Sequence, residues 1–214
     1  MAYRYDEFAP GEVYHIFTRG VEKREIFMDD INRSRFINLL LHCMPRGPIR
    51  SYSIAKRLGQ KPKRTAPGKG LIDLLCYCLM SNHIHLLVHE NVEGGISLYM
   101  QRLLNSYAKY FNARYERSGS LFTNPFRAVL VDQDEQLLHV ARYIHLNPFV
   151  ARTIENPLSY KWYSLTEYIR PSPYPRCHRH IITGMLKPEE HRVFVEDEAE
   201  YARSLHYIQH LLID

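Results

Sequence analysis

The chain has 214 residues, of which 45% are hydrophobic and 24% are charged, and its formal net charge is +5 at pH 7. This composition excludes a disordered chain and fits one globular domain with appended segments. No apolar run reaches the roughly 18 residues that span a membrane, and the N-terminus lacks the apolar core of a signal peptide. We therefore expect a cytoplasmic protein without membrane contact, and its basic excess favours a polyanionic partner.

The sequence pattern in the first third of the chain predicts a strand, a helix and a basic loop. Residues 13–18 are rich in β-branched and aromatic side chains, which favours a strand. A helix follows from Asp29–Asp30 and ends at Met44–Pro45. Residues 45–70 contain eight Lys or Arg and no acidic residue. We expect a mostly irregular loop here, with a short strand at Arg50–Ile54. Two interpretations of this loop remain open: a solvated insertion, or a segment that contacts phosphates.

Two adjacent strands are predicted in the middle of the chain. Residues 71–80 form a continuous apolar run, which is typical of a central strand buried on both faces. After a turn, residues 83–90 alternate, so that Ile84, Leu86 and Val88 face the core. His83 and His85 then lie together on the opposite, more open face.

The remaining elements complete the predicted fold. Helical spacing indicates a helix over 97–114, a strand follows at 127–131, and a helix from Asp132 or Asp134 reaches Asn147, where Pro148 ends it. The order of elements predicts an α+β, ferredoxin-like antiparallel sheet with helices on one face. The last helix, which bears Tyr143, is expected to lie over the histidine face.

The residues that carry chemistry lie on the second central strand and on this last helix. His83 and His85 alternate on a strand and so share one face. Tyr143 and Asn147 are four residues apart and so share one face of a helix. Two neutral imidazoles and an amide oxygen are possible ligands for a divalent metal, and a phenol beside them is a possible nucleophile toward a phosphodiester.

Each of these residues also has a structural explanation. Two alternating histidines are often packing or surface residues, Tyr143 alone would pack on the sheet, and an asparagine before proline often ends a helix. Two functional alternatives also remain at this point: a non-cleaving protein that binds a nucleic-acid hairpin, and a metal hydrolase with water as its nucleophile. The joint arrangement of the four residues favours tyrosine chemistry.

The ordered motifs resemble the HUH single-tyrosine transposases of the IS200-like family, in particular the REP-associated tyrosine transposase branch. The resemblance covers residues 8 to 168. Its strongest motifs are Ser81-Asn82-His83-Ile84-His85-Leu86 and Tyr143-Ile144-His145-Leu146-Asn147-Pro148, with Tyr160-Lys161-Trp162-Tyr163-Ser164 downstream. Ser81 departs from the proline found there in many relatives.

The resemblance implies the roles of these residues. His83, His85 and Asn147 would bind Mg²⁺ or Mn²⁺, and Tyr143 would attack single-stranded DNA that carries a hairpin, through a 5′-phosphotyrosine intermediate. Residues 1–169 would form the catalytic domain, and residues 170–214 would add a proline-spaced linker and an acidic C-terminal helix. Relatives act as monomers or homodimers, so both states stay open here.

Several basic residues are candidates for DNA contact. Phosphate contacts from Arg or Lys position a nucleic acid and make its affinity depend on salt. The basic loop would add Lys61, Lys63 and Arg64. The candidates outside that loop are Arg19, Arg102, Lys109, Arg127 and Arg142.

Overall fold

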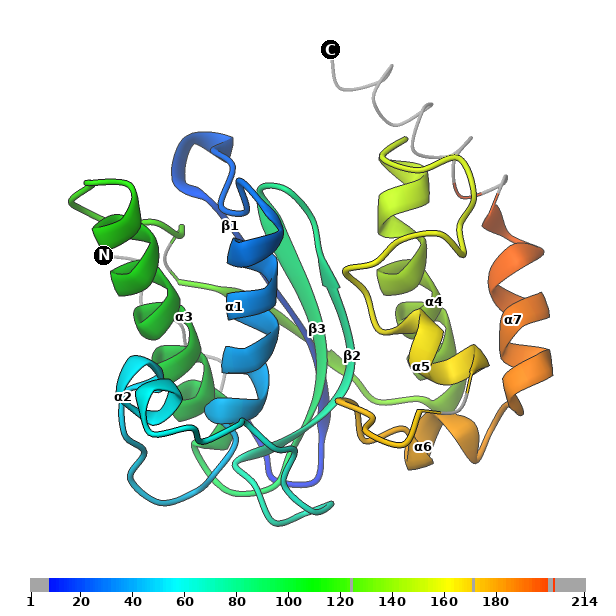
Figure 1. Cartoon of the computed structure of the whole chain (residues 1–214). Coiled ribbons are helices and arrows are strands. Elements are labelled where there is room, and N and C mark those ends of the chain that lie inside the picture. Colours follow the sequence, from blue (N-terminus) through cyan, green and yellow to red (C-terminus); the bar gives the residue numbers. More distant parts are fainter. Residues whose placement is uncertain (1–7, 124, 171, 200–201, 203–214) are drawn as a thin grey trace.

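The computed structural model describes residues 8–123, 125–170, 172–199 and 202, in which a four-stranded sheet lies between two layers of helices (Figure 1). The strands are β1 (Val13–Arg19), β2 (Ile72–Leu79), β3 (His83–Glu90) and β4 (Arg127–Val131). Their order across the sheet is β2-β3-β1-β4, and every neighbouring pair is antiparallel. This order confirms the predicted α+β, ferredoxin-like sheet.

Helices cover both faces of the sheet (Figure 1). One layer contains α1 (Asp30–His42), α2 (Tyr52–Arg57) and α3 (Gly95–Arg114). The other layer contains α4 (Asp134–Val150), α5 (Leu165–Ile169) and α7 (Pro188–Glu196). The short helix η1 (Val21–Lys23) follows β1, and the short helix α6 (His180–Thr183) precedes α7. Because α4 packs on β2 and β3, β2 is buried along its whole length between the two layers.

The prediction of a short strand at Arg50–Ile54 is wrong, because this segment enters α2. The Ser51 hydroxyl accepts a hydrogen bond from the Ile54 backbone N–H at 3.4 Å and so caps the helix. Tyr52 and Ala55, three residues apart, are the buried residues of α2. That spacing places them on one helical face, which a strand would not do.

The predicted end of the last core helix at Asn147 is also wrong, because α4 continues through Pro148 to Val150. Proline lacks the N–H that would bond to the preceding turn, so the helix loses one hydrogen bond at this position. The next turn still closes, since the Ala151 N–H donates to the Asn147 carbonyl at 2.9 Å. Proline therefore weakens the last turn without ending the helix.

The outer edge of β2 is covered by the segment that follows α4. The Leu79 N–H donates to the Trp162 carbonyl, and the Ser164 N–H donates to the Tyr77 carbonyl, both at 2.9 Å. Further along the edge, the His178 N–H donates to the Leu74 carbonyl at 2.7 Å. These bonds satisfy backbone groups that an open edge strand would expose to pairing with other chains.

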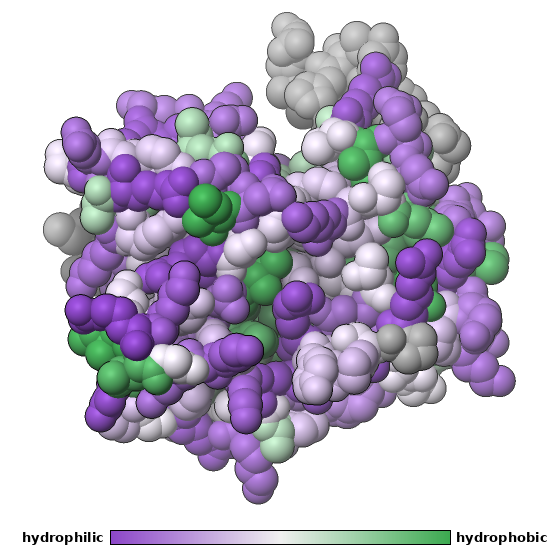
Figure 2. Space-filling view, in the orientation of Figure 1, coloured by the Kyte–Doolittle hydropathy of each residue, from purple (hydrophilic) through white to green (hydrophobic). Residues whose placement is uncertain are grey.

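The surface is mainly hydrophilic on the face shown in Figure 2, where hydrophobic side chains form small separate spots. None of the described helices combines the length and the apolar character that crossing a membrane requires.

Gly95, the first residue of α3, touches the backbone that leads into β2. A Cβ atom at this position would lie 2.4 Å from the Leu71 carbonyl oxygen. We expect Gly95→Ala to lower the free energy of unfolding by about 2 kcal/mol, as measured by urea titration, although alanine favours helix by about 1 kcal/mol. Gly47→Ala, whose new Cβ meets nothing within 4 Å, is the matched control. An unchanged midpoint for Gly95→Ala would contradict this packing.

Candidate active site

The register of β1 on β3 gathers polar side chains on the face of the sheet that α4 covers. Phe17 is paired with His85, and Arg19 is paired with His83. Paired residues of antiparallel strands project to the same face, and so does His15, two residues before Phe17. The fold thus brings a third histidine to the two that the sequence motif supplies.

Asn82 fixes the orientation of His83. The Asn82 amide nitrogen donates to the Lys23 carbonyl at 3.1 Å, so the amide oxygen is the atom that lies 2.7 Å from His83 Nδ1. An amide oxygen only accepts hydrogen bonds, which means that Nδ1 carries the proton and Nε2 keeps its lone pair. Burial lowers the pKa of His83, the Asn147 side chain raises it by accepting a hydrogen bond from the protonated ring, and the Arg19 charge lowers it. The imidazole is therefore neutral near pH 7.

His15 holds His85 from the other side. His15 Nε2 and His85 Nδ1 are 3.0 Å apart, and their rings stack with centroids separated by 5.2 Å. Burial lowers the pKa of His85 well below its usual value, and repulsion between protonated rings of His85, His83 and His15 lowers it further. Burial also lowers the pKa of His15 to about 4. Both rings are neutral, and a proton on His85 Nδ1 leaves its Nε2 free to bind a metal.

Tyr143 of α4 lies above this pair of imidazoles. Its ring is nearly perpendicular to those of His85 and His15, with centroids 5.6 and 5.9 Å away. It is nevertheless 54% exposed, so its hydroxyl is open to a large substrate. One turn later, the Asn147 amide nitrogen donates to the Tyr143 carbonyl at 2.9 Å. This bond leaves the amide oxygen for the contact with His83, and it fixes the two residues relative to each other.

Comparison with known proteins assigns the chain to a family. Residues 36–147, just over half of the chain, match the family model described as "Transposase IS200 like". The chain belongs to the IS200-like transposase family. The resemblance predicted from the motifs is confirmed at this level, and the matched region contains His83, His85, Tyr143 and Asn147.

One solved structure supports the fold of this transposase. The structure of a REP-associated tyrosine transposase bound to a REP hairpin aligns with a TM-score of 0.52 and 11% identity, over 83% of this chain and 90% of that one. A protein from Deinococcus radiodurans, described as a presumed transposase, aligns with a TM-score of 0.37 and 13% identity, over 67% of this chain and 95% of that one. No curated relative matches the chain significantly.

The possible ligands for a divalent metal in this transposase are a mixed set of histidine and asparagine side chains. Among the described residues, no group of three His, Cys, Asp or Glu is placed to hold a metal ion. The ring centroids of His83 and His85 are 5.0 Å apart, and the third possible donor is the Asn147 amide oxygen near His83. With the proton on Nδ1 in both rings, two imidazole Nε2 atoms and one amide oxygen form a mixed nitrogen and oxygen donor set for a divalent metal ion.

Two of the five predicted DNA-contacting residues lie on the histidine face. Arg19 is exposed opposite His83, and Arg127 is exposed on β4, paired with Phe17. Arg142 precedes Tyr143, but its guanidinium lies 4.1 Å from the centre of the Phe194 ring and donates to the Phe194 carbonyl at 3.3 Å. It therefore fastens α4 to α7.

The other predicted cations lie elsewhere. Arg102 and Lys109 are on α3, in the helical layer on the opposite side of the sheet (Figure 1). In the basic loop, Arg64 donates to the Cys177 carbonyl, while Lys61 and Lys63 are exposed. The cations that were predicted together as DNA contacts therefore lie on two different surfaces of the fold.

His15 is the residue of this site that the sequence did not single out. It lies in a strand of mixed apolar and aromatic residues, without a second histidine two positions away. Its contact with His85 depends on the pairing of strands that are about 70 residues apart in the chain. Once the antiparallel pairing of β1 with β3 is known, the alternation of side chains along β1 places His15 on the same face as His85.

Proposed function

We propose that this transposase is a metal-dependent endonuclease of single-stranded DNA that cleaves and rejoins strands through Tyr143. The observation that carries the proposal is the position of Tyr143, half exposed above His15 and His85 and one turn before Asn147. A water-based hydrolase would not require an exposed phenol at this place.

The residues have distinct parts in the proposed reaction. The Tyr143 oxygen attacks phosphorus, the bond from phosphorus to the 3′ oxygen breaks, and the DNA keeps a 5′-phosphotyrosine link. The phenolic proton passes to solvent, and the departing 3′ oxygen gains a proton to become a hydroxyl. Since the phosphotyrosine retains a phosphodiester, a second 3′-hydroxyl reverses the step and joins strands without a nucleotide cofactor.

Bound Mg²⁺ or Mn²⁺ would polarise the scissile phosphate and stabilise the charge that develops on it. His83 and His85 would hold the ion through their Nε2 atoms, and Asn147 through its amide oxygen. His15 would keep the His85 ring in the required tautomer and orientation. Arg19 and Arg127, exposed on the same face, would contact phosphates of the substrate strand.

A hairpin-containing single strand is the proposed substrate class. The family assignment supports DNA as the substrate, and the solved relative with the same fold is bound to a REP hairpin.

The test is a covalent-adduct assay. Labelled single-stranded DNA from repeats flanking the gene, folded into a hairpin, is incubated with the protein and Mn²⁺, and the products are resolved on a denaturing protein gel. We expect label to migrate with the protein. Chelation of the metal should abolish the adduct, and Tyr143→Phe should reduce it by at least about 10⁴-fold because the nucleophile is missing.

Tyr174→Phe is the matched control, since Tyr174 is 87% exposed and lies outside this site. It should form the adduct at the wild-type rate, and Tyr143→Phe should still bind the hairpin. Cleavage that survives Tyr143→Phe without an adduct would replace the proposal by a water-using nuclease. Hairpin binding by the wild-type protein without any cleavage would indicate a domesticated binding protein.

A further inference from the structure

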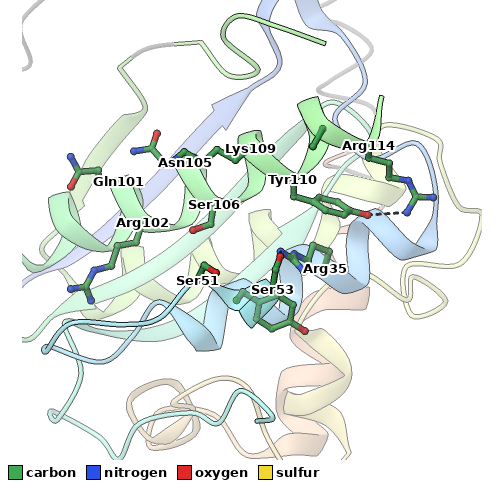
Figure 3. A pocket seen from close by; sticks show the side chains of 12 residues that line it. Arg35, Ser51, Ser53, Gln101, Arg102, Asn105, Ser106, Lys109, Tyr110 and Arg114 are labelled. Carbon is green, nitrogen blue, oxygen red and sulfur yellow. Dashed lines mark hydrogen bonds between the residues drawn. The ribbon is translucent and has the colours of Figure 1, made fainter. Parts of the chain in front are cut away.

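Polar side chains lie in different surroundings in the two helical layers. In the layer of α1, α2 and α3, polar residues line a hollow of about 650 Å³, and Gln101, Asn105 and Lys109 are exposed there (Figure 3). In the layer of α4, by contrast, His145 and Ser164 are fully buried. Because burial of a polar group is costly unless the group is hydrogen-bonded, these two side chains need partners inside the protein.

Ser164 joins α4 to the edge of β2. The Tyr77 N–H donates to the Ser164 hydroxyl oxygen at 2.9 Å, and the Ser164 backbone N–H donates to the Tyr77 carbonyl at 2.9 Å. The hydroxyl oxygen also lies 3.3 Å from that carbonyl and 2.9 Å from Nε2 of His145. A hydroxyl donates one hydrogen bond and accepts two. Donation to the Tyr77 carbonyl, with acceptance from the Tyr77 N–H and from a proton on His145 Nε2, uses this capacity completely.

The bond between His145 and Ser164 connects two sequence motifs, and the proposed reaction uses neither of these residues. His145 comes from the motif that contains Tyr143, and Ser164 ends the motif at residues 160–164. The second motif lies along the outer edge of β2 and forms backbone hydrogen bonds with that strand. The helix that bears the nucleophile is therefore tied to the sheet by side chains from both motifs.

His145 and Tyr143 project from opposite sides of α4. At about 100° per residue, a separation of two residues corresponds to about 200° around the helix axis. Tyr143 thus lies over His15 on β1 and His85 on β3. His145 instead contacts Ser164 at the outer edge of β2. A rotation of α4 about its axis that moves the Tyr143 ring therefore stretches or breaks the bond of His145 to Ser164.

We propose that His145 and Ser164 are positioning residues, which set the rotation of α4 and so hold the Tyr143 oxygen where it attacks phosphorus. The proposal rests on the proposed function, because it gives these two residues a part in the same reaction. Displacement of a reacting group by about 1 Å lowers a rate by as much as about 100-fold. Loss of the bond should therefore slow the chemical step at saturating Mn²⁺ and leave the affinity for the hairpin unchanged.

The test compares two buried histidines of the same layer that differ in their hydrogen bonds. His145→Phe removes the donor to Ser164. His191→Phe makes the same change at a ring whose centroid is 5.8 Å away and whose nitrogens have no partner among the described residues. The rate of adduct formation is measured at saturating labelled hairpin and saturating Mn²⁺. His145→Phe should lower this rate about 10–100-fold with unchanged hairpin affinity, and His191→Phe should stay within about twofold of the parent protein.

Two further variants separate positioning from packing. His145→Gln restores an N–H donor near the place of Nε2 and should recover most of the lost rate. Ser164→Ala removes the acceptor, so the double variant with His145→Phe should react no more slowly than Ser164→Ala alone. An unchanged rate in His145→Phe, an equal loss in His191→Phe, additive losses in the double variant, or recovery of His145→Phe by more Mn²⁺ would each overturn the proposal.

A measurement without DNA or metal keeps this test separate from that of the proposed function. A trifluoromethyl probe is attached to Tyr143→Cys, whose thiol is at an exposed position, whereas the four native cysteines are buried. Its ¹⁹F resonance should shift or broaden when His145→Phe is added and should stay unchanged with His191→Phe. An unchanged resonance in both backgrounds would overturn the proposal. A shift with His145→Phe in a protein that forms no adduct would support the placement of Tyr143 by His145 and overturn the cleavage proposal.

Discussion

His85→Ala is expected to lower the rate of covalent adduct formation by about 10³-fold, because it removes one of the two imidazoles proposed to hold the metal. Several kcal/mol of transition-state stabilisation by a metal correspond to a rate factor of this size. The ring is buried and held by His15. The rate is measured by quenching the labelled-hairpin reaction at intervals, over a range of Mn²⁺ concentrations.

A series of histidine variants separates metal binding from packing. His15→Ala removes only the residue that orients His85, so a loss of about 10–100-fold is expected, partly restored by more Mn²⁺. His89→Ala is the control on the same strand, since His89 is hydrogen-bonded to Asn91 at 2.9 Å and lies at the far end of β3 from His83. A wild-type rate for His85→Ala would show that the metal is bound elsewhere. A loss as large in His89→Ala would indicate damage to the strand.

The strands of this site could be predicted from the sequence because each has a strong local pattern. β3 was predicted with its observed bounds, since the alternation of His83, Ile84, His85 and Leu86 defines two faces. β4 was likewise predicted correctly at residues 127–131. The relation of Tyr143 to Asn147 follows from helical spacing alone, and the hydrogen bond between them agrees with it.

What could not be predicted depends on contacts between distant parts of the chain. The sequence places Arg102 and Lys109 on the polar face of a helix, but it does not say which side of the sheet that helix covers. Arg142 is basic and adjacent to the nucleophile, yet the packing of α7 against α4 gives it Phe194 as a partner. Local errors had two different causes. α4 continues through Pro148, where a proline would usually end the helix, and the strand predicted at Arg50–Ile54 missed the helix cap at Ser51.

Lowering the pH from 7 to 5 is expected to reduce the free energy of unfolding by at least about 4 kcal/mol, the share of two of the imidazoles that are buried in their neutral form, His15 and His191. Burial lowers the pKa of both His15 and His191 from 6.5 to about 4. Between these values the unfolded chain binds a proton on each histidine that the folded chain does not bind. Stability that is complete above pH 6.5 is therefore lost as the pH falls toward 4, by about 2 kcal/mol per histidine at pH 5. Urea titrations at several pH values measure the effect.

His191→Phe should remove about 2 kcal/mol of this loss between pH 7 and pH 5. The His191 ring stacks on Tyr168 with centroids 4.9 Å apart, and neither of its nitrogens has a hydrogen-bond partner within the described part of the chain. A phenyl ring occupies similar space and leaves no polar atom unsatisfied, so the variant should also be slightly more stable at pH 7. His139→Phe, at a half-exposed position of α4, is the control and should keep the wild-type slope. If His191→Phe kept that slope too, the imidazole would have to be protonated in the folded protein, and the acid sensitivity would arise from other groups.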